Sequence, residues 1–171
     1  CDNKLSKGVY AKDLVLHIIN ELGVKAGVGF AYEFAGPAIS SLSMEERMTI
    51  CNMSIEGGAR CGYINPDEKT FSYIKNKLCA PKNENWGKAL KWWRSLKSDE
   101  DSIYDDVIKI DASKIEPTVT WGITPGQSIG INQQIPLLDE LSPNDKLVAE
   151  EAYEYMSFKP GQSIKDIPVE V

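Results

Sequence analysis

Residues 42–75 read LSMEERMTICNMSIEGGARCGYINPDEKTFSYIK, and this stretch decides the fold. Its first part predicts a helix that ends at the glycine pair 57–58, and a second helix is predicted to begin with Pro66 in its first position. Within the first helix Asn52 and Glu56 lie four positions apart, so they share one face. This raises the question of why the otherwise apolar segment 49–58 of a buried-looking helix carries a carboxylate.

The start of that first helix is strongly marked. Ser43 is followed three residues later by Glu46, which is the pattern of a capping box. Helical spacing then sorts the side chains into two neighbouring stripes. The first, apolar stripe holds Met44, Met48, Cys51 and Ile55, and the second, polar stripe holds Glu45, Thr49, Asn52 and Glu56.

Helical and extended patterns alternate along the rest of the chain. Apolar periodicity and capping residues predict further helices over 10–23, 66–78, 86–98 and 142–158, with a short helical turn at 38–40. Strands are predicted around 28–34 and over 60–65, 107–113 and 117–122, with a short extended piece in the loop 123–136 and a strand start at 167–171. Such alternation is typical of an α/β fold.

Composition narrows the classes of function. The chain has 171 residues and a net charge of −6, and this acidity argues against binding nucleic acid or an anionic membrane. Its apolar runs are too short to cross a bilayer, and residues 1–20 lack the apolar core of an export signal. The four cysteines, Cys1, Cys51, Cys61 and Cys79, match no zinc or iron–sulfur spacing. We expect them to be reduced in a cytoplasmic protein.

Single residues leave the function open. Arg60 could hold a substrate carboxylate, although an ordinary surface arginine would look the same. The single histidine, His17, lies on a predicted amphipathic helix, where a structural role is the simpler interpretation. The stretch TPGQ (124–127) could line a cleft or form a plain turn. In most proteins an Asn and a Glu four positions apart are either solvated or bonded to the backbone, without a catalytic role. Asn52, Glu56, Arg60 and His17 therefore do not by themselves identify a catalytic site.

Several long blocks of sequence, taken in their order along the chain, indicate a function more specifically than any single residue. The stretch 42–75 resembles the aconitase family of hydro-lyases, and within it the branch that acts on isopropylmalate. Further blocks match in the same order, namely 11–19, 32–39, 86–101, 104–127 and 152–164. The resemblance covers nearly the whole chain. It implies an aconitase-like α/β/α segment, with short strands and flanking helices, in which residues 1–171 form one part of a larger α/β domain.

The resemblance also implies an activity. Members of this family dehydrate and rehydrate a hydroxy acid around a [4Fe-4S] cluster, and this branch converts 2-isopropylmalate into 3-isopropylmalate in leucine biosynthesis. Asn52 and Glu56 match the Asn-Met-x-x-Glu motif of the family. The motif places the pair beside the cluster, where the Glu would hydrogen-bond the iron-bound water or hydroxyl. These two are the expected catalytic residues, with Arg60 as a candidate for substrate binding.

The departures from the family pattern are equally informative. The family's cluster ligands lie in a Gly-Ser-Cys-Thr-Asn loop and a later Cys-x-x-Cys, and its histidine motif is Asp-Ser-His-Thr; none of the three occurs here. We therefore expect no metal ligand in this chain. The chain is expected to be an internal piece of the large subunit, inactive alone, whose partner is a small subunit that completes the substrate site.

Other hypotheses remain open from the sequence. A homoaconitase, an aconitase proper or a methylmalate- or citramalate-type hydratase would share most of these blocks. A non-enzymatic binding module could reuse the fold without needing Asn52, Glu56 and Arg60 in one cleft. A scaffold with an exposed docking face is a third hypothesis. RNA binding, which occurs among aconitase relatives, fits poorly with the net charge of −6.

Overall fold

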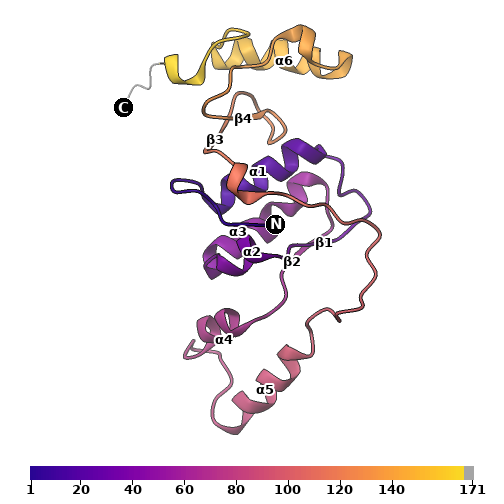
Figure 1. The fold of residues 1–171 in the computed structure, drawn as a ribbon, viewed down its shortest axis with the longest axis vertical. Coiled ribbons are helices and arrows are strands. Elements are labelled where there is room, and N and C mark those ends of the chain that lie inside the picture. The colour runs from indigo at the N-terminus through magenta and orange to yellow at the C-terminus, as the bar shows by residue number, and fades with distance from the viewer. Residues whose placement is uncertain (168–171) are drawn as a thin grey trace.

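Helices dominate the computed structural model, which describes residues 1–167 (Figure 1). The α-helices are α1 (Ala11–Leu22), α2 (Pro37–Ser41), α3 (Met44–Met53), α4 (Glu68–Ile74), α5 (Glu84–Arg94) and α6 (Pro143–Met156). Four short 3-10 helices are η1 (Ser54–Gly57), η2 (Ala112–Lys114), η3 (Leu138–Glu140) and η4 (Ile164–Asp166). The described residues contain no helix long and apolar enough to cross a membrane.

The strands pair in two small sheets. β1 (Tyr32–Glu33) runs parallel to β2 (Gly62–Tyr63), and β3 (Thr118–Thr120) is antiparallel to β4 (Ser128–Gly130). The mixed α/β class is therefore confirmed, although each strand is shorter than predicted. The strand predicted over 107–113 is wrong, because that segment makes only one isolated bridge, from Asp111 to Asp2, before η2 begins. Most of the strand start predicted at 167–171 lies outside the described residues.

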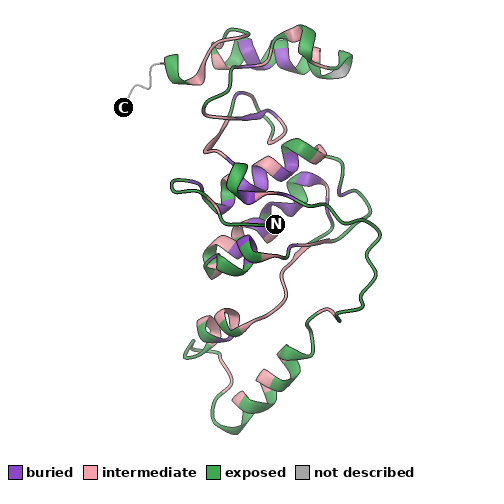
Figure 2. Ribbon diagram, viewed as in Figure 1, coloured by how far each residue is buried: buried purple, intermediate pink, exposed green. Residues whose placement is uncertain are grey.

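The main hydrophobic core forms around α1. This helix buries the face that carries Leu14, Val15, Ile18 and Ile19, as its apolar periodicity predicts. It packs on α3, and Figure 2 shows the buried positions concentrated where the two helices lie together. The remaining buried members of this core are Val9, Ala11, Leu16, Phe34, Ile39, Leu42, Ile50, Met53, Ile110 and Ile115.

A second, smaller core lies between the β3–β4 hairpin and α6. Trp121 packs against Tyr153 with ring centroids 5.4 Å apart, and Ile135 is almost fully buried beside them. The Tyr153 hydroxyl donates a hydrogen bond to the Pro136 carbonyl at 2.7 Å. The hairpin therefore has one face toward this core, while its other contacts reach α1.

The buried face of α3 differs from the predicted one. Arg47, Ile50 and Met53 are buried, whereas Met48 and Ile55 of the predicted apolar stripe are 47% and 69% exposed. Arg47 can enter the interior because its guanidinium is held by the Asp67 carboxylate at 2.7 Å. The capping box at Ser43 and Glu46 is confirmed.

Candidate active site

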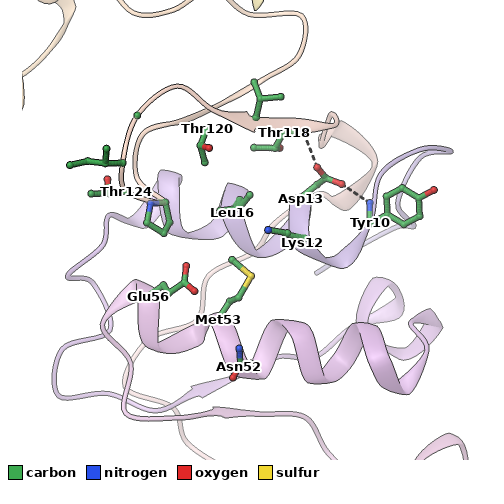
Figure 3. Close-up of a pocket in the computed structure, with 14 residues that line it drawn as sticks. Tyr10, Lys12, Asp13, Leu16, Asn52, Met53, Glu56, Thr118, Thr120 and Thr124 are labelled. Carbon is green, nitrogen blue, oxygen red and sulfur yellow. Dashed lines mark hydrogen bonds between the residues drawn. The ribbon is translucent and has the colours of Figure 1, made fainter. Parts of the chain in front are cut away.

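An open cleft of about 960 Å³ crosses α1 from the β3–β4 hairpin to α3 and η1 (Figure 3). The hairpin and the loop between its strands form one wall, and α3 with η1 forms the other. The first turns of α1 lie between them. The lining residues are Tyr10, Lys12, Asp13, Leu16, Asn52, Met53, Glu56, Thr118, Val119, Thr120, Gly122, Ile123, Thr124 and Pro125.

Asn52 and Glu56, the expected catalytic pair, both line this cleft. The helix changes type between them, since Asn52 is in the last turn of α3 and Glu56 is in η1. Figure 3 shows the Glu56 carboxylate directed away from η1 toward α1. Both side chains are exposed, so the expectation of a buried segment is wrong at these two positions. The carboxylate is available to a ligand rather than locked into the core.

The glycine pair after Glu56 turns the chain sharply out of η1. Gly58 has φ +86°, a left-handed conformation that a side chain would strain. A Cβ on this residue would also lie 3.1 Å from the Val24 carbonyl oxygen. The turn therefore ends η1 directly after the carboxylate and holds Glu56 at the edge of the cleft.

Asp13 ties the hairpin wall to α1. One carboxylate oxygen accepts a hydrogen bond from the Tyr10 backbone N–H at 2.7 Å, and the other accepts one from the Thr118 backbone N–H at 2.7 Å. The same side chain thus caps the start of α1 and fixes the first residue of β3. Figure 3 shows both bonds at one end of the cleft.

The other polar groups of the cleft were not predicted as site residues. Lys12 brings an ammonium from α1, and Thr118 and Thr120 bring hydroxyls from β3. Lysine and threonine are common surface residues, so only the packing of the hairpin against α1 distinguishes these. The two alternatives left open for TPGQ both hold in part, since Thr124 and Pro125 line the cleft and the Gln127 N–H donates to the Thr124 carbonyl to close a turn.

Arg60 is not brought to this site. Its side chain is exposed and is not among the cleft-lining residues, and its backbone N–H donates to the Phe30 carbonyl at 2.8 Å. His17 lies on the partly exposed side of α1, where its ring contacts the Glu21 carboxylate at 3.1 Å. That local contact agrees with the structural role expected of this histidine.

The described residues do not fit a metal cluster. Cys1, Cys51, Cys61 and Cys79 are all free thiols, and within residues 1–167 no three histidine, cysteine or carboxylate side chains converge on a possible metal position. Burial raises the pKa of the Cys51 thiol, with a further contribution from nearby Cys61, which opposes the thiolate form that a cluster needs. That the cluster ligands lie outside this chain stays a prediction.

Comparison with known proteins gives the same family as the sequence blocks. The aconitase family (aconitate hydratase) matches residues 1–171. A 3-isopropylmalate dehydratase large subunit of Prochlorococcus marinus (strain MIT 9215) is 90% identical over the full 171 residues. Proteins of the same name from Synechocystis sp. (strain PCC 6803) and Synechococcus sp. (strain CC9311) are 62% and 61% identical over 98% and 99% of the chain.

The aligned region is only part of each relative. The chain spans 36% of the length of these three proteins, which agrees with the expectation of one part within a longer large subunit. Since the family match extends over every residue, this chain belongs to the aconitase family.

Proposed function

We propose that these residues form part of the large subunit of an isopropylmalate hydro-lyase, which interconverts 2-isopropylmalate and 3-isopropylmalate by loss and return of water. The observation that carries the proposal is the placement of the matched pair, Asn52 and Glu56, in one open cleft of a chain that belongs to the aconitase family. Support for the substrate comes from the large subunits that are up to 90% identical.

Within the cleft the two side chains suit different tasks. The Glu56 carboxylate can accept or return a proton at the oxygen that leaves or enters the substrate. The Asn52 amide can donate a hydrogen bond to a substrate oxygen and so orient it. Arg60 was a candidate for the substrate carboxylate, but its absence from the cleft lining gives that role no support here.

The remaining parts of the proposal concern groups beyond this chain. In the intact enzyme a [4Fe-4S] cluster would supply Lewis-acid chemistry, and its ligands would come from other residues than those described. A small subunit would complete the substrate site, and residues 1–171 would be one part of an aconitase-like α/β domain. A biosynthetic enzyme with an oxygen-sensitive cluster and reduced cysteines suits the cytoplasm or an organelle matrix.

The test is isopropylmalate turnover by the intact large subunit that carries this sequence, assembled with its small subunit. Glu56→Gln keeps the size of the side chain but removes its basic oxygen, so we expect kcat to fall about 100-fold or more. The melting temperature should stay unchanged, because Glu56 is exposed.

The matched control is Glu45→Gln, an exposed carboxylate on α3 outside the cleft, which should leave kcat within about twofold of the wild type. An active wild type whose turnover is insensitive to Glu56→Gln would remove this residue from the chemistry. A correctly assembled wild type that does not convert isopropylmalate would refute the proposed function.

A further inference from the structure

We infer that Gln127 is a positioning residue, whose side chain shapes the wall of the cleft formed by the loop 121–127. The expected effect of Gln127 on substrate turnover rests on the proposed function. The hydrogen bonds between the Gln127 side chain and the loop do not depend on that function. Gln127 does not line the cleft, so it would act on a substrate only through the loop.

The Gln127 side chain closes the loop on itself. It is only 8% exposed, and its Oε1 accepts hydrogen bonds from the backbone N–H of Ile123 at 2.7 Å and of Thr124 at 3.2 Å. Two backbone hydrogen bonds close the same loop. The Trp121 N–H donates to the Gln127 carbonyl at 2.8 Å, and the Gln127 N–H donates to the Thr124 carbonyl at 2.9 Å. Two of the loop's amides thus depend on one side-chain oxygen.

The space around this amide is filled. A Cβ on Gly122 would overlap the Gln127 amide, so a larger residue there would push this amide away from the two N–H groups that it accepts. On the other side, a Cβ on Gly126 would lie 3.0 Å from a methyl group of Val24. The loop therefore has little room to shift while the Gln127 amide stays in place.

Both strands that flank the loop are fixed to α1. Asp13 accepts the Thr118 N–H at the start of β3, and Asn20 donates to the Ser128 carbonyl at the start of β4. Asp13 and Asn20 lie seven residues, about two turns, apart, which puts them on one side of α1. The flanking strands are held in this way and the Trp121 N–H joins the two ends of the loop, so the remaining freedom of the loop is in residues 122–125.

Those four residues line the cleft together with Glu56. Ile123 and Thr124 are the exposed members, and they are the two whose N–H groups Gln127 holds. A change in the Gln127 contact should therefore move the wall that a bound substrate meets, without touching Asn52 or Glu56. The expected effect is on substrate binding more than on the proton transfer.

The first measurement is hydrogen exchange at single-amide resolution on the intact large subunit. Gln127→Met keeps a side chain of similar length but cannot accept the two N–H groups, so exchange at Ile123 and Thr124 should accelerate about tenfold or more. Gln127→Glu keeps an acceptor oxygen and should retain slow exchange. Exchange that stays within about twofold of the wild type in Gln127→Met would overturn the inference.

The second measurement is the steady-state kinetics of the assembled enzyme. Gln127→Met should raise KM for isopropylmalate about fivefold or more with a smaller change in kcat, and Gln127→Glu should restore KM. The matched control is Gln133→Met, because Gln133 accepts the Gly130 N–H at 2.8 Å in the same hairpin but lies outside the cleft lining.

An equal rise of KM in Gln127→Met and Gln133→Met would overturn the positioning role, since general loosening of the hairpin would then explain both. An inactive wild type would count against the proposed function alone. In that case the exchange rates still decide whether Gln127 holds the loop.

Discussion

Arg47 is a charged residue that lies buried on a helix face which the apolar pattern did not predict. Its side chain is 4% exposed, and its two terminal nitrogens donate to the two carboxylate oxygens of Asp67 at 2.8 and 2.7 Å. The second nitrogen also donates to the Ser40 carbonyl at 3.1 Å. The bonds from Arg47 lower the pKa of Asp67 from 3.8 to about 2. The ionised carboxylate is therefore part of the folded structure.

This lowered pKa predicts a pH dependence of stability. Because the folded pKa lies below the unfolded one, Asp67 stabilises the fold fully above about pH 4, and that contribution is lost as the pH falls toward 2. Asp67→Asn should lower the free energy of unfolding by about 1–2 kcal/mol at neutral pH, a value reduced for the 43% exposure of the carboxylate. It should also flatten the loss of stability between about pH 4 and pH 2.

Urea unfolding as a function of pH checks this prediction. Asp139→Asn serves as the control, since that carboxylate is fully exposed and 3.7 Å from Lys146. The same acid-side slope in the wild type and in Asp67→Asn would show that the Arg47 pair does not govern it.

At the scale of elements, two carboxylates that cap helices differ in what else they bind. Glu46 accepts the Ser43 N–H at the start of α3, and Asp13 accepts the N–H of Tyr10, the residue that precedes α1. Asp13 also accepts the Thr118 N–H of β3. A cap alone stabilises one helix, but Asp13 also joins a helix to a strand more than 100 residues away in sequence. This long-range contact brings the hairpin to the cleft.

We expect Asp13→Ala to lower the free energy of unfolding by about 2–3 kcal/mol, compared with about 1 kcal/mol for Glu46→Ala. The larger loss of unfolding free energy in Asp13→Ala corresponds to about one hydrogen bond, the one that Asp13 makes with the Thr118 N–H. Urea titration of both variants measures it. Equal losses in the two variants would mean that the Asp13–Thr118 bond does not hold the hairpin.

At the scale of the whole molecule, stability is unevenly distributed. Figures 1 and 2 show α5 projecting from the rest of the chain with an exposed surface, and none of its residues is buried. Few contacts join it to α4: Trp93 stacks on Phe71 with 6.2 Å between ring centroids, and Arg94 donates to the Glu68 carboxylate at 2.7 Å. The contact of Trp86 with Trp93, at 5.7 Å between centroids, lies within α5 itself. By contrast, α1 has six buried residues.

Hydrogen exchange of this chain should reflect that contrast. An eleven-residue helix with little tertiary packing is marginally stable in water, so amides of α5 should exchange about 100-fold or more faster than those of α1. Exchange detected by mass spectrometry on peptides from the two helices provides the measurement. Similar protection in α1 and α5 would show that the aromatic contacts make α5 part of the main cooperative unit.

The sequence by itself determined the family, the main helices and the catalytic candidates. These features depend on local patterns: apolar periodicity in α1, the capping box at Ser43, and the Asn-Met-x-x-Glu motif at Asn52 and Glu56. The periodicity and the capping box can be recognised within a few residues, because their physical cause acts over one or two turns of the chain. The Asn-Met-x-x-Glu motif gained its meaning only from the family resemblance, which covers nearly the whole chain. The catalytic roles of Asn52 and Glu56 remain predictions.

Only the tertiary structure decided which distant residues join the site. The cleft needs the hairpin near α1, and that contact depends on Asp13 and Asn20 meeting backbone groups more than 100 residues away. The buried Arg47 needed Asp67, twenty residues further on, before its charge could enter the core. Such contacts satisfy groups that have no partner in their own segment, so no local pattern predicts them.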